Sequence, residues 1–254
     1  FFDDALVASK ELEITLTGKS CGLEERAPMC GIPYHAVEGY LSKLVSRGYK
    51  VAICEQVEDP KLAKGLVKRE VIRVVTPGTN LNVQSLEAGK NNYLLSIAYT
   101  PDGIGISAAD VTTGDYYVTE VEDLKKLNDE LMKYEPSEII CNEAFLVSGF
   151  DVNDLKTRLH ISVNALESHM FDDNGCRRIL MKDFQVNTLI GLGVEEFPTG
   201  LLAAGALLQY LYDTQKTDLE HFTHIYPYLT SKYMLLDSST RRNLELTETL
   251  REKQ

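Results

Sequence analysis

The clearest pattern in the chain is an apolar stripe with helical spacing between residues 36 and 47. Five apolar residues recur three or four positions apart and so share one face of a helix: Val37, Tyr40, Leu41, Leu44 and Val45. Gly48 follows directly, and glycine is the residue that most often ends a helix. The pattern predicts a helix over 36–47 that packs one side onto a core.

Shorter patterns surround this helix in the first third of the sequence. Asp3 and Asp4 are placed as acids usually are in the first turn of a helix, which predicts a helix over 3–13. Strands are predicted at three runs rich in β-branched residues, 14–17, 49–55 and 70–75. Cys54 lies in the apolar run of the second strand and is expected in the core.

A change of composition divides the chain after Thr79. The turn sequence Thr76-Pro77-Gly78-Thr79 ends the last of these strands, and residues 80–92 have the composition of a linker. We therefore predict a first domain over residues 1–79, of small mixed α/β type.

The second part begins with three strands in quick succession, at 93–100, 104–110 and 115–121. Short turns separate them, which predicts an antiparallel meander. A helix over 122–134, short strands at 138–141 and 161–163, and an apolar helix over 201–212 follow, the last with Thr199 as its N-cap. The order predicts an α/β layer domain over residues 93–224.

Residues 225–254 have a different character. A polar helix is predicted over 237–254, and its few apolar residues are too sparse to bury one another. We expect this segment to begin an all-α domain. The chain has no initiator Met, so residue 1 is not expected to be the natural beginning.

The charge is unevenly distributed along the chain. The net charge is −12, yet residues 1–79 carry 11 Lys and Arg against 11 Asp and Glu, so the remainder carries 15 against 27. Because an acidic surface repels phosphate, any nucleic-acid contact is expected in the first third and protein contacts in the rest. The alternative is that the acidity only confers solubility.

Composition also bounds the class of protein. The sequence has no continuous apolar stretch of membrane-spanning length and no signal peptide. The five cysteines form no C-x-x-C pair, which favours a reduced, cytoplasmic compartment.

Several motifs suggest chemistry without supporting it. Gly18-Lys19-Ser20 resembles the end of a phosphate-binding loop, but Glu13 stands where that motif needs glycine. His221 and His224 have the spacing of a metal pair, but no third ligand stands nearby in the sequence. We predict neither a nucleotide nor a metal site, and no catalytic residue.

Asp110 calls for a separate hypothesis, because it ends a strand of the predicted meander. Strand-end carboxylates on a ribonuclease-H-type sheet can hold two Mg²⁺ ions for phosphodiester cleavage. Asp102 and Asp115 are neighbours, but both lie in tight turns, where aspartate commonly forms the turn. A metal-dependent nuclease using Asp110 is therefore the alternative function, and a structural turn residue is the favoured interpretation.

Basic residues of the first domain form a looser group. They lie in or beside the loop 56–66 and in one turn, and they are Lys19, Lys61, Lys64, Lys68 and Arg69. Cations on loops suit phosphate contacts, which position a protein on DNA without determining sequence. A merely solvated surface is the alternative.

Three stretches of sequence carry a family resemblance. The first is Phe1-Phe2-Asp3-Asp4-Ala5; the second runs from Ala27 through Gly31-Ile32-Pro33-Tyr34-His35 to Val51–Gln56 and Thr76-Pro77-Gly78-Thr79; the third is 237–245, with Thr240-Arg241-Arg242-Asn243-Leu244-Glu245. Together they resemble the MutS family of DNA mismatch-recognition proteins over the whole chain.

The resemblance implies that the first domain kinks duplex DNA and binds mispaired or unpaired bases. In the family a Phe wedge enters from the minor groove beside the mismatch, and a Glu two residues on bonds the base; kinking costs least where stacking is already weak. Both residues would lie upstream of Phe1. Phe1 and Phe2 are instead expected to pack the first helix onto the sheet. The implied DNA-binding residues are Lys19, Met29, Lys68 and Arg69.

The resemblance further implies that the second domain is a ribonuclease-H-like connector without nuclease activity. The family's connector relays the nucleotide state and binds a MutL-type partner, and Arg177 and Arg178 match the region of that docking surface. ATP and Mg²⁺ would bind in a domain outside this chain, which itself needs no cofactor. The full-length protein is expected to be a homodimer at the nucleoid, in the cytoplasm, and 225–254 to begin its core domain.

Overall fold

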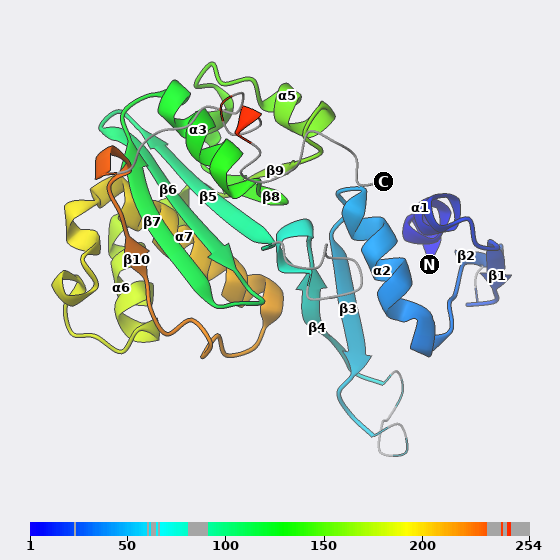
Figure 1. Ribbon diagram of the computed structural model, residues 1–254. Coiled ribbons are helices and arrows are strands. Elements are labelled where there is room, and N and C mark those ends of the chain that lie inside the picture. Colours follow the sequence, from blue (N-terminus) through cyan, green and yellow to red (C-terminus); the bar gives the residue numbers. More distant parts are fainter. Residues whose placement is uncertain are drawn as a thin grey trace. The chain divides into compact units, whose positions relative to one another are not determined.

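The computed structural model describes residues 1–22, 24–59, 61, 65, 67–80, 91–232, 240 and 243–244. The chain divides into two compact units, Phe1–Lys90 and Asn91–Gln254, and each is described by itself (Figure 1). The α/β and α+β class predicted from the sequence is confirmed.

The first unit combines helices with two separate two-stranded sheets. Its elements are α1 (Phe2–Leu12), β1 (Thr17–Lys19), β2 (Ala27–Met29), the 3₁₀ turn Tyr34–Ala36, α2 (Val37–Ser46), β3 (Val51–Gln56), β4 (Arg69–Val75) and the 3₁₀ turn Pro77–Thr79. β1 pairs with β2, and β3 pairs with β4, both antiparallel. The two expected helices and the strands at 49–55 and 70–75 are confirmed within two residues.

The strand expected at 14–17 is displaced toward the C-terminus. Glu13 adopts a left-handed conformation that ends α1, and Ile14 donates its backbone N–H back to the Ser9 carbonyl at 3.1 Å. Pairing begins only at Thr17, opposite Met29. Cross-strand pairing, and not the β-branched run, therefore sets where this strand starts.

The core of the first unit lies between α2 and the β3–β4 hairpin. Leu41, Val45 and Val75 are buried there, and Val51 and Ile53 pack against them. Alternate residues of a strand point to opposite faces, so Cys54 turns away from α2 and is exposed. Its expected burial is therefore wrong. In Figure 1, α2 lies between α1 and this hairpin.

Phe1 and Phe2 also differ from expectation. Each side chain is 53% exposed, so neither packs α1 firmly onto a sheet. Polar contacts join α1 to the residues that follow α2: Arg47 binds the Glu11 carboxylate at 2.5 Å, and Tyr49 donates to the same carboxylate at 3.3 Å.

The second unit is built on a six-stranded sheet in the order β10-β7-β6-β5-β8-β9. Its strands are β5 (Tyr93–Thr100), β6 (Gly103–Asp110), β7 (Asp115–Val121), β8 (Glu138–Cys141), β9 (Ser162–Ala165) and β10 (Tyr226–Pro227). β5, β6 and β7 form the predicted antiparallel meander, and β8, β9 and β10 join it in parallel. The predicted layer arrangement is confirmed.

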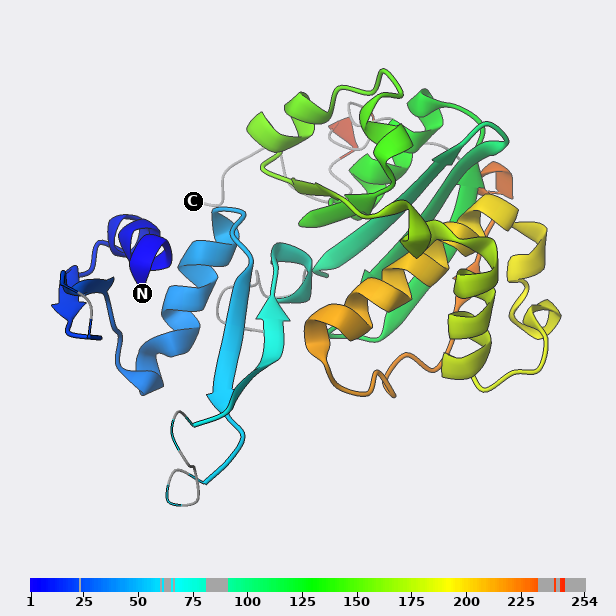
Figure 2. The same cartoon turned by 180° about the vertical axis from the view of Figure 1, so that it is seen from behind.

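Helices cover both faces of this sheet. They are α3 (Leu124–Tyr134), α4 (Glu143–Leu146), α5 (Val152–Thr157), α6 (Asp173–Asp183) and α7 (Pro198–Gln215), with 3₁₀ turns at Ser168–Phe171, Leu189–Leu192, Val194–Glu196 and Thr230–Lys232. Figure 2 shows α7 lying across one face with α6 beside it. α3 and α5 pack on the other face, where Leu127, Leu131 and Leu155 join the second core.

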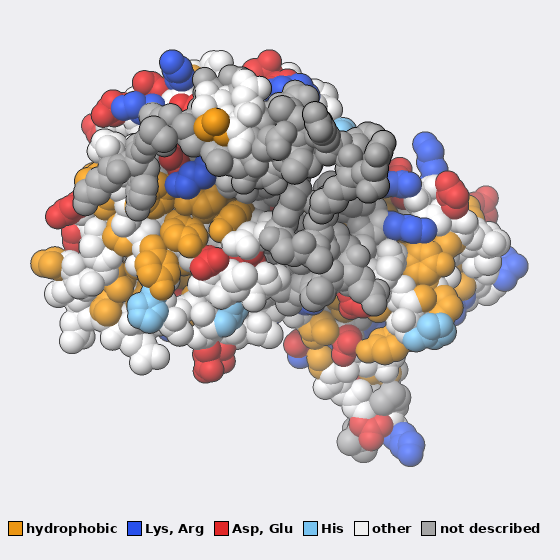
Figure 3. Space-filling view, viewed as in Figure 1, with side chains coloured by type: hydrophobic (Ala, Val, Ile, Leu, Met, Phe, Trp, Pro, Cys, Tyr) orange, Lys and Arg blue, Asp and Glu red, His pale blue; other side chains and the backbone are white. Residues whose placement is uncertain are grey.

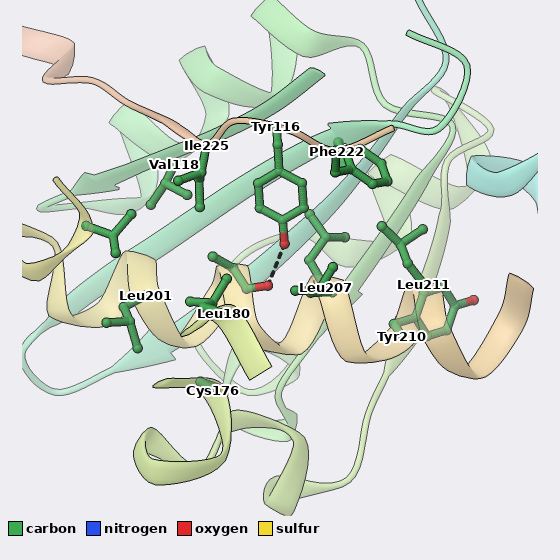
Figure 4. Close-up of a cluster of buried hydrophobic side chains, with 14 of the residues drawn as sticks. Tyr116, Val118, Cys176, Leu180, Leu201, Leu207, Tyr210, Leu211, Phe222 and Ile225 are labelled. Atoms are coloured by element: carbon green, nitrogen blue, oxygen red, sulfur yellow. Dashed lines mark hydrogen bonds between the residues drawn. The ribbon is translucent and has the colours of Figure 1, made fainter. Parts of the chain in front are cut away.

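The core beneath α7 is the larger of the two. Leu201, Leu207 and Leu211 of α7 meet Val118 of β7 and Leu180 of α6 (Figure 4). Tyr116 is fully buried among them and donates its hydroxyl to the Ala204 carbonyl at 2.6 Å, which satisfies its polar end. The buried helix predicted at 201–212 is thus confirmed and extends to Gln215.

The N-terminus of α7 is fixed in a way that the sequence does not reveal. Thr199 is not the N-cap; it lies inside the first turn, and the helix begins at Pro198. The Glu120 carboxylate of β7 instead accepts the Thr199 and Gly200 N–H groups, at 2.5 and 2.9 Å. A carboxylate at this end satisfies free N–H groups and suits the helix dipole.

The sheet continues past the domain boundary expected at residue 224. Tyr226 and Pro227 pair with Tyr117 and Val118, so a short strand of the sheet lies beyond that residue. The boundary itself stays a prediction. The helix expected over 237–254 falls almost entirely outside the described residues.

Candidate nucleic-acid interface

Lys19 and Met29 come together on the small β1–β2 sheet. Thr17 faces Met29 in the register, and Thr17 Oγ1 donates to the Met29 carbonyl at 2.8 Å. Lys19, opposite Ala27, is exposed, and its Nζ lies 5.9 Å from the centre of the Phe1 ring. The strand conformation of Thr17–Lys19 also agrees with the rejection of a phosphate-binding loop here.

Two exposed residues of this unit, Arg26 and Tyr34, were not among the residues predicted from the sequence. Arg26 is exposed, and its side chain lies close to Gly18, where a Cβ on the glycine would stand 3.1 Å from Arg26 Cβ. Tyr34 is 86% exposed on the turn that leads into α2. An aromatic residue between Pro33 and His35, outside any apolar periodicity, was the available signal for Tyr34.

Lys68 and Arg69 lie at the other strand pair, where β4 begins. Arg69 is exposed opposite Gln56. Lys68 Nζ forms an ion pair with Glu70 at 2.5 Å, so its charge is partly compensated. Among the residues that the structure describes, Lys19, Arg26 and Arg69 form no ion pair. Lys61 is exposed, and Lys64 lies outside the described residues.

The structure therefore does not gather all four predicted DNA-binding residues. Lys19 and Met29 share one sheet, whereas Lys68 and Arg69 stand at the start of β4. Figures 1 and 2 both place β1–β2 and the strand pair β3–β4 on opposite sides of α2. A duplex touching both groups would have to span this unit.

Asp110 has a structural role at the turn between β6 and β7. It is fully buried; Oδ1 accepts the Thr112 N–H at 2.8 Å and the Thr112 hydroxyl at 2.6 Å, and Oδ2 accepts the Asn92 N–H at 2.9 Å. Asp115 accepts the Thr113 hydroxyl at 2.8 Å. Within the described residues, no group of three His, Cys, Asp or Glu side chains could hold a metal ion. The nuclease hypothesis has no support here.

His221 and His224 are likewise occupied by protein contacts. The His221 ring lies 4.3 Å from that of Phe222, and burial lowers the pKa of His221. His224 Nδ1 bonds the Thr223 hydroxyl at 2.8 Å.

In the described part of the chain, no helix is long and apolar enough to cross a membrane.

Arg177 and Arg178 differ in their availability to a partner. Arg177 bonds Asp173 and Glu195, each at 2.9 Å, and these carboxylates raise its pKa. It therefore fastens α6 to the turn Val194–Glu196. Arg178 is exposed, and among the described residues only its Nε has a hydrogen-bond partner, the Asn174 carbonyl at 3.2 Å.

The arrangement defines a two-unit α/β protein with a cation-bearing small unit and an acidic sheet unit. Two family models match it: MutS domain I over residues 1–84 and MutS domain II over residues 92–223. The chain belongs to the MutS family, and its two units correspond to those two domains.

Several relatives are similar along the whole chain. Proteins named DNA mismatch repair protein MutS from Lachnoclostridium phytofermentans, Ruminiclostridium cellulolyticum and Acetivibrio thermocellus are 65%, 50% and 49% identical to it. Each comparison covers 100% of this chain but only 27%, 29% and 29% of the relative. The chain thus spans less than a third of their length.

Proposed function

We propose that this chain is the part of a mismatch-recognition protein that contacts duplex DNA through its first unit and relays that contact through its second. One observation carries the proposal. Three exposed cations, Lys19, Arg26 and Arg69, have no ion-pair partner among the described residues, and they lie on a unit with no net charge. Phosphate contacts of this kind orient a protein on DNA, while mismatches are distinguished by the low cost of bending them.

The proposal is tested by fluorescence anisotropy over a range of salt concentrations. The experiment compares binding to a duplex with one mismatch and binding to the matched duplex. We expect Lys19→Glu with Arg69→Glu to weaken binding to both duplexes. The slope of log K against log salt should become shallower by about 0.9 for each phosphate that the variant no longer neutralises. The charge-matched control is Lys125→Glu with Lys156→Glu, two exposed residues of the second unit, because it changes the net charge by the same amount.

The control distinguishes specific DNA contacts at these residues from attraction by net charge. Loss of affinity that is equal in the control and in the double variant would assign the effect to net charge and overturn the placement of the site. An Arg26→Glu variant should behave like Lys19→Glu, because both residues flank the same small sheet.

We further propose that the exposed face of α6 binds a MutL-type protein. Arg178 supports this proposal, because its guanidinium is exposed while the neighbouring Arg177 is paired within the unit. Arg178→Glu should weaken binding to immobilised MutL, and Lys156→Glu on α5 should not. Equal binding by both variants would exclude this face.

For the whole protein we propose a homodimer that acts at the nucleoid in the cytoplasm and binds ATP and Mg²⁺ outside this chain. The names of the relatives and the 27% of the first relative that the chain covers support this proposal. Titration of this chain with Mg·ATP should give no binding heat, and the full-length protein should give both binding and a dimer mass by light scattering. ATP binding by this chain would contradict it.

A further inference from the structure

A group of aromatic side chains lies on the α3 side of the sheet in the second unit, from β5 through β7 to β10. Tyr117 lies 5.8 Å from Tyr226 and 6.5 Å from Tyr93, and His224 stacks on Tyr226 at 6.1 Å between ring centres. Tyr226 is 49% exposed, and Tyr93 and Tyr117 are partly exposed. Figure 3 shows hydrophobic side chains collected over this part of the unit, with histidine beside them. We call Tyr93, Tyr117, Tyr226 and His224 the tyrosine face.

A carboxylate borders this face. Asn91 Nδ2 donates to the Tyr93 hydroxyl at 2.6 Å and to Asp115 Oδ2 at 3.3 Å, which brings the acid alongside the phenols. Burial, followed by the charge of Asp115, raises the pKa of Tyr117. Rings and carboxylate together form a surface with the two features that attract a cation: negative aromatic faces and a formal negative charge.

The same cluster already holds a cation of the protein itself. Lys133 Nζ lies 3.9 Å from the centre of the Tyr228 ring, 4.8 Å from that of Tyr134, and 3.1 Å from Glu130 Oε2. Tyr134 stands 5.0 Å from Tyr93 and 6.0 Å from Tyr117, so the two sets of rings are continuous. Lys133 thus shows how an ammonium group fits rings and carboxylate on this surface.

The charge of the unit decides which partner suits the face. Residues 91–232 carry 10 Lys and Arg against 22 Asp and Glu, a net of −12. That charge repels the phosphates of nucleic acid and attracts basic protein segments. Tyrosine is also enriched at protein interfaces, where it contributes much binding energy.

From these observations we propose that the tyrosine face, with Asp115, is a docking site for a basic segment of a partner protein, which inserts an arginine or lysine between the rings and the carboxylate. This surface is distinct from the α6 face and does not depend on DNA contact by the first unit.

The test uses the whole chain with 3-fluorotyrosine incorporated, observed by fluorine NMR. Three probes are titrated: a short peptide alternating arginine and leucine, the matched peptide alternating glutamate and leucine, and a short oligothymidylate. We expect only the arginine peptide to shift the Tyr117 and Tyr226 resonances. Tyr226→Leu and Asp115→Asn should each weaken its binding about two- to fivefold, the size of one exposed cation–π or ionic contact.

Matched controls separate recognition from bulk acidity. Glu143→Gln removes an exposed charge elsewhere on the same unit, and Tyr34→Leu removes an exposed ring from the other unit; both should leave the affinity unchanged. Tyr226→Phe keeps the ring and should retain binding. Equal weakening by Asp115→Asn and Glu143→Gln, equal binding of the glutamate peptide, or resonance shifts caused by oligothymidylate alone would each overturn the proposal.

Discussion

Single polar side chains hold critical positions in the second unit. Asp110 has no exposure, yet each of its oxygens accepts backbone or hydroxyl hydrogens at 2.6 to 2.9 Å. It ties the start of β5 at Asn92 to the turn at Thr112. An acid with this many donors is a structural residue, which is why its position at a strand end does not signify catalysis.

Replacing this side chain should therefore cost stability. Asp110→Ala removes the acceptor of the N–H of Asn92, a buried residue, and a buried unsatisfied group costs about 1–3 kcal/mol. Urea unfolding measures the destabilisation. Asp102→Ala, in an exposed turn, is the control and should change the free energy of unfolding by no more than about 0.5 kcal/mol. Equal destabilisation in the two variants would show that the Asp110 bonds contribute nothing.

The five cysteines differ in exposure, and Cys30 is intermediate. Cys21 and Cys54 are exposed, whereas burial raises the pKa of Cys141 and of Cys176 to about 12. Near pH 8 the two buried thiols are neutral and inaccessible, so iodoacetamide should label Cys21 and Cys54 first. Mass spectrometry of the native protein checks the order, with urea-unfolded protein as the control. Fast labelling of Cys141 or Cys176 would contradict the burial.

At the scale of elements, local apolar periodicity predicted helices and strands, whereas it did not predict contacts between residues far apart in the sequence. The meander and the helices around Leu41 and Leu207 follow directly from apolar spacing. The capping of α7 by Glu120 does not, because 79 residues separate Glu120 from Thr199 and no local signal links them. The burial of Cys54 was predicted wrongly because α2 covers only one face of the two-stranded hairpin. Apolar content alone does not indicate on which face a residue lies.

The candidate site was predictable to a lesser extent. Sequence identified Lys19 and Arg69 as exposed cations, but which of them share a surface depends on strand pairing. Arg26 was missed because it becomes a neighbour of β1 only when the hairpin forms. Likewise Lys68 looked equivalent to Arg69 until its pairing with Glu70 was visible.

The crossing of α7 over β6 offers a test of packing between elements. A Cβ at Gly105 would stand 2.0 Å from the Thr199 carbonyl oxygen and 2.5 Å from the Gly200 nitrogen, both backbone atoms that cannot swing aside. Gly105→Ala should lower the free energy of unfolding by about 3 kcal/mol or more, or prevent folding. Gly39→Ala, with open space around it on α2, should instead raise it by up to about 1 kcal/mol. Urea unfolding of both variants compares the two, and a tolerated Gly105→Ala would show that the helix sits further from the sheet.

At the scale of the whole molecule, the charge is partitioned between the units. Residues 1–79 carry equal numbers of acids and bases, while residues 91–232 carry a net −12. The acidic unit therefore opposes the approach of DNA to any part of the chain within reach of its field. That reach is set by salt, from about 30 Å at 0.01 M to about 3 Å at 1 M ionic strength.

Because the acidic unit repels DNA, substitutions that remove its acids should strengthen DNA binding, although none of them changes a proposed DNA-contacting residue. Neutralising three exposed acids of the second unit (Glu143→Gln, Glu196→Gln and Glu220→Gln) should strengthen duplex binding about two- to fivefold at low salt, where charges act at long range. The counterpart that neutralises Lys125, Lys156 and Lys182 should weaken it by a similar factor. Both effects should fade as salt rises, because screening removes long-range repulsion before it removes direct phosphate contacts. A gain that persists at high salt would mean that these acids meet the duplex directly, and no change at low salt would mean that the acidity of the second unit serves its protein contacts alone.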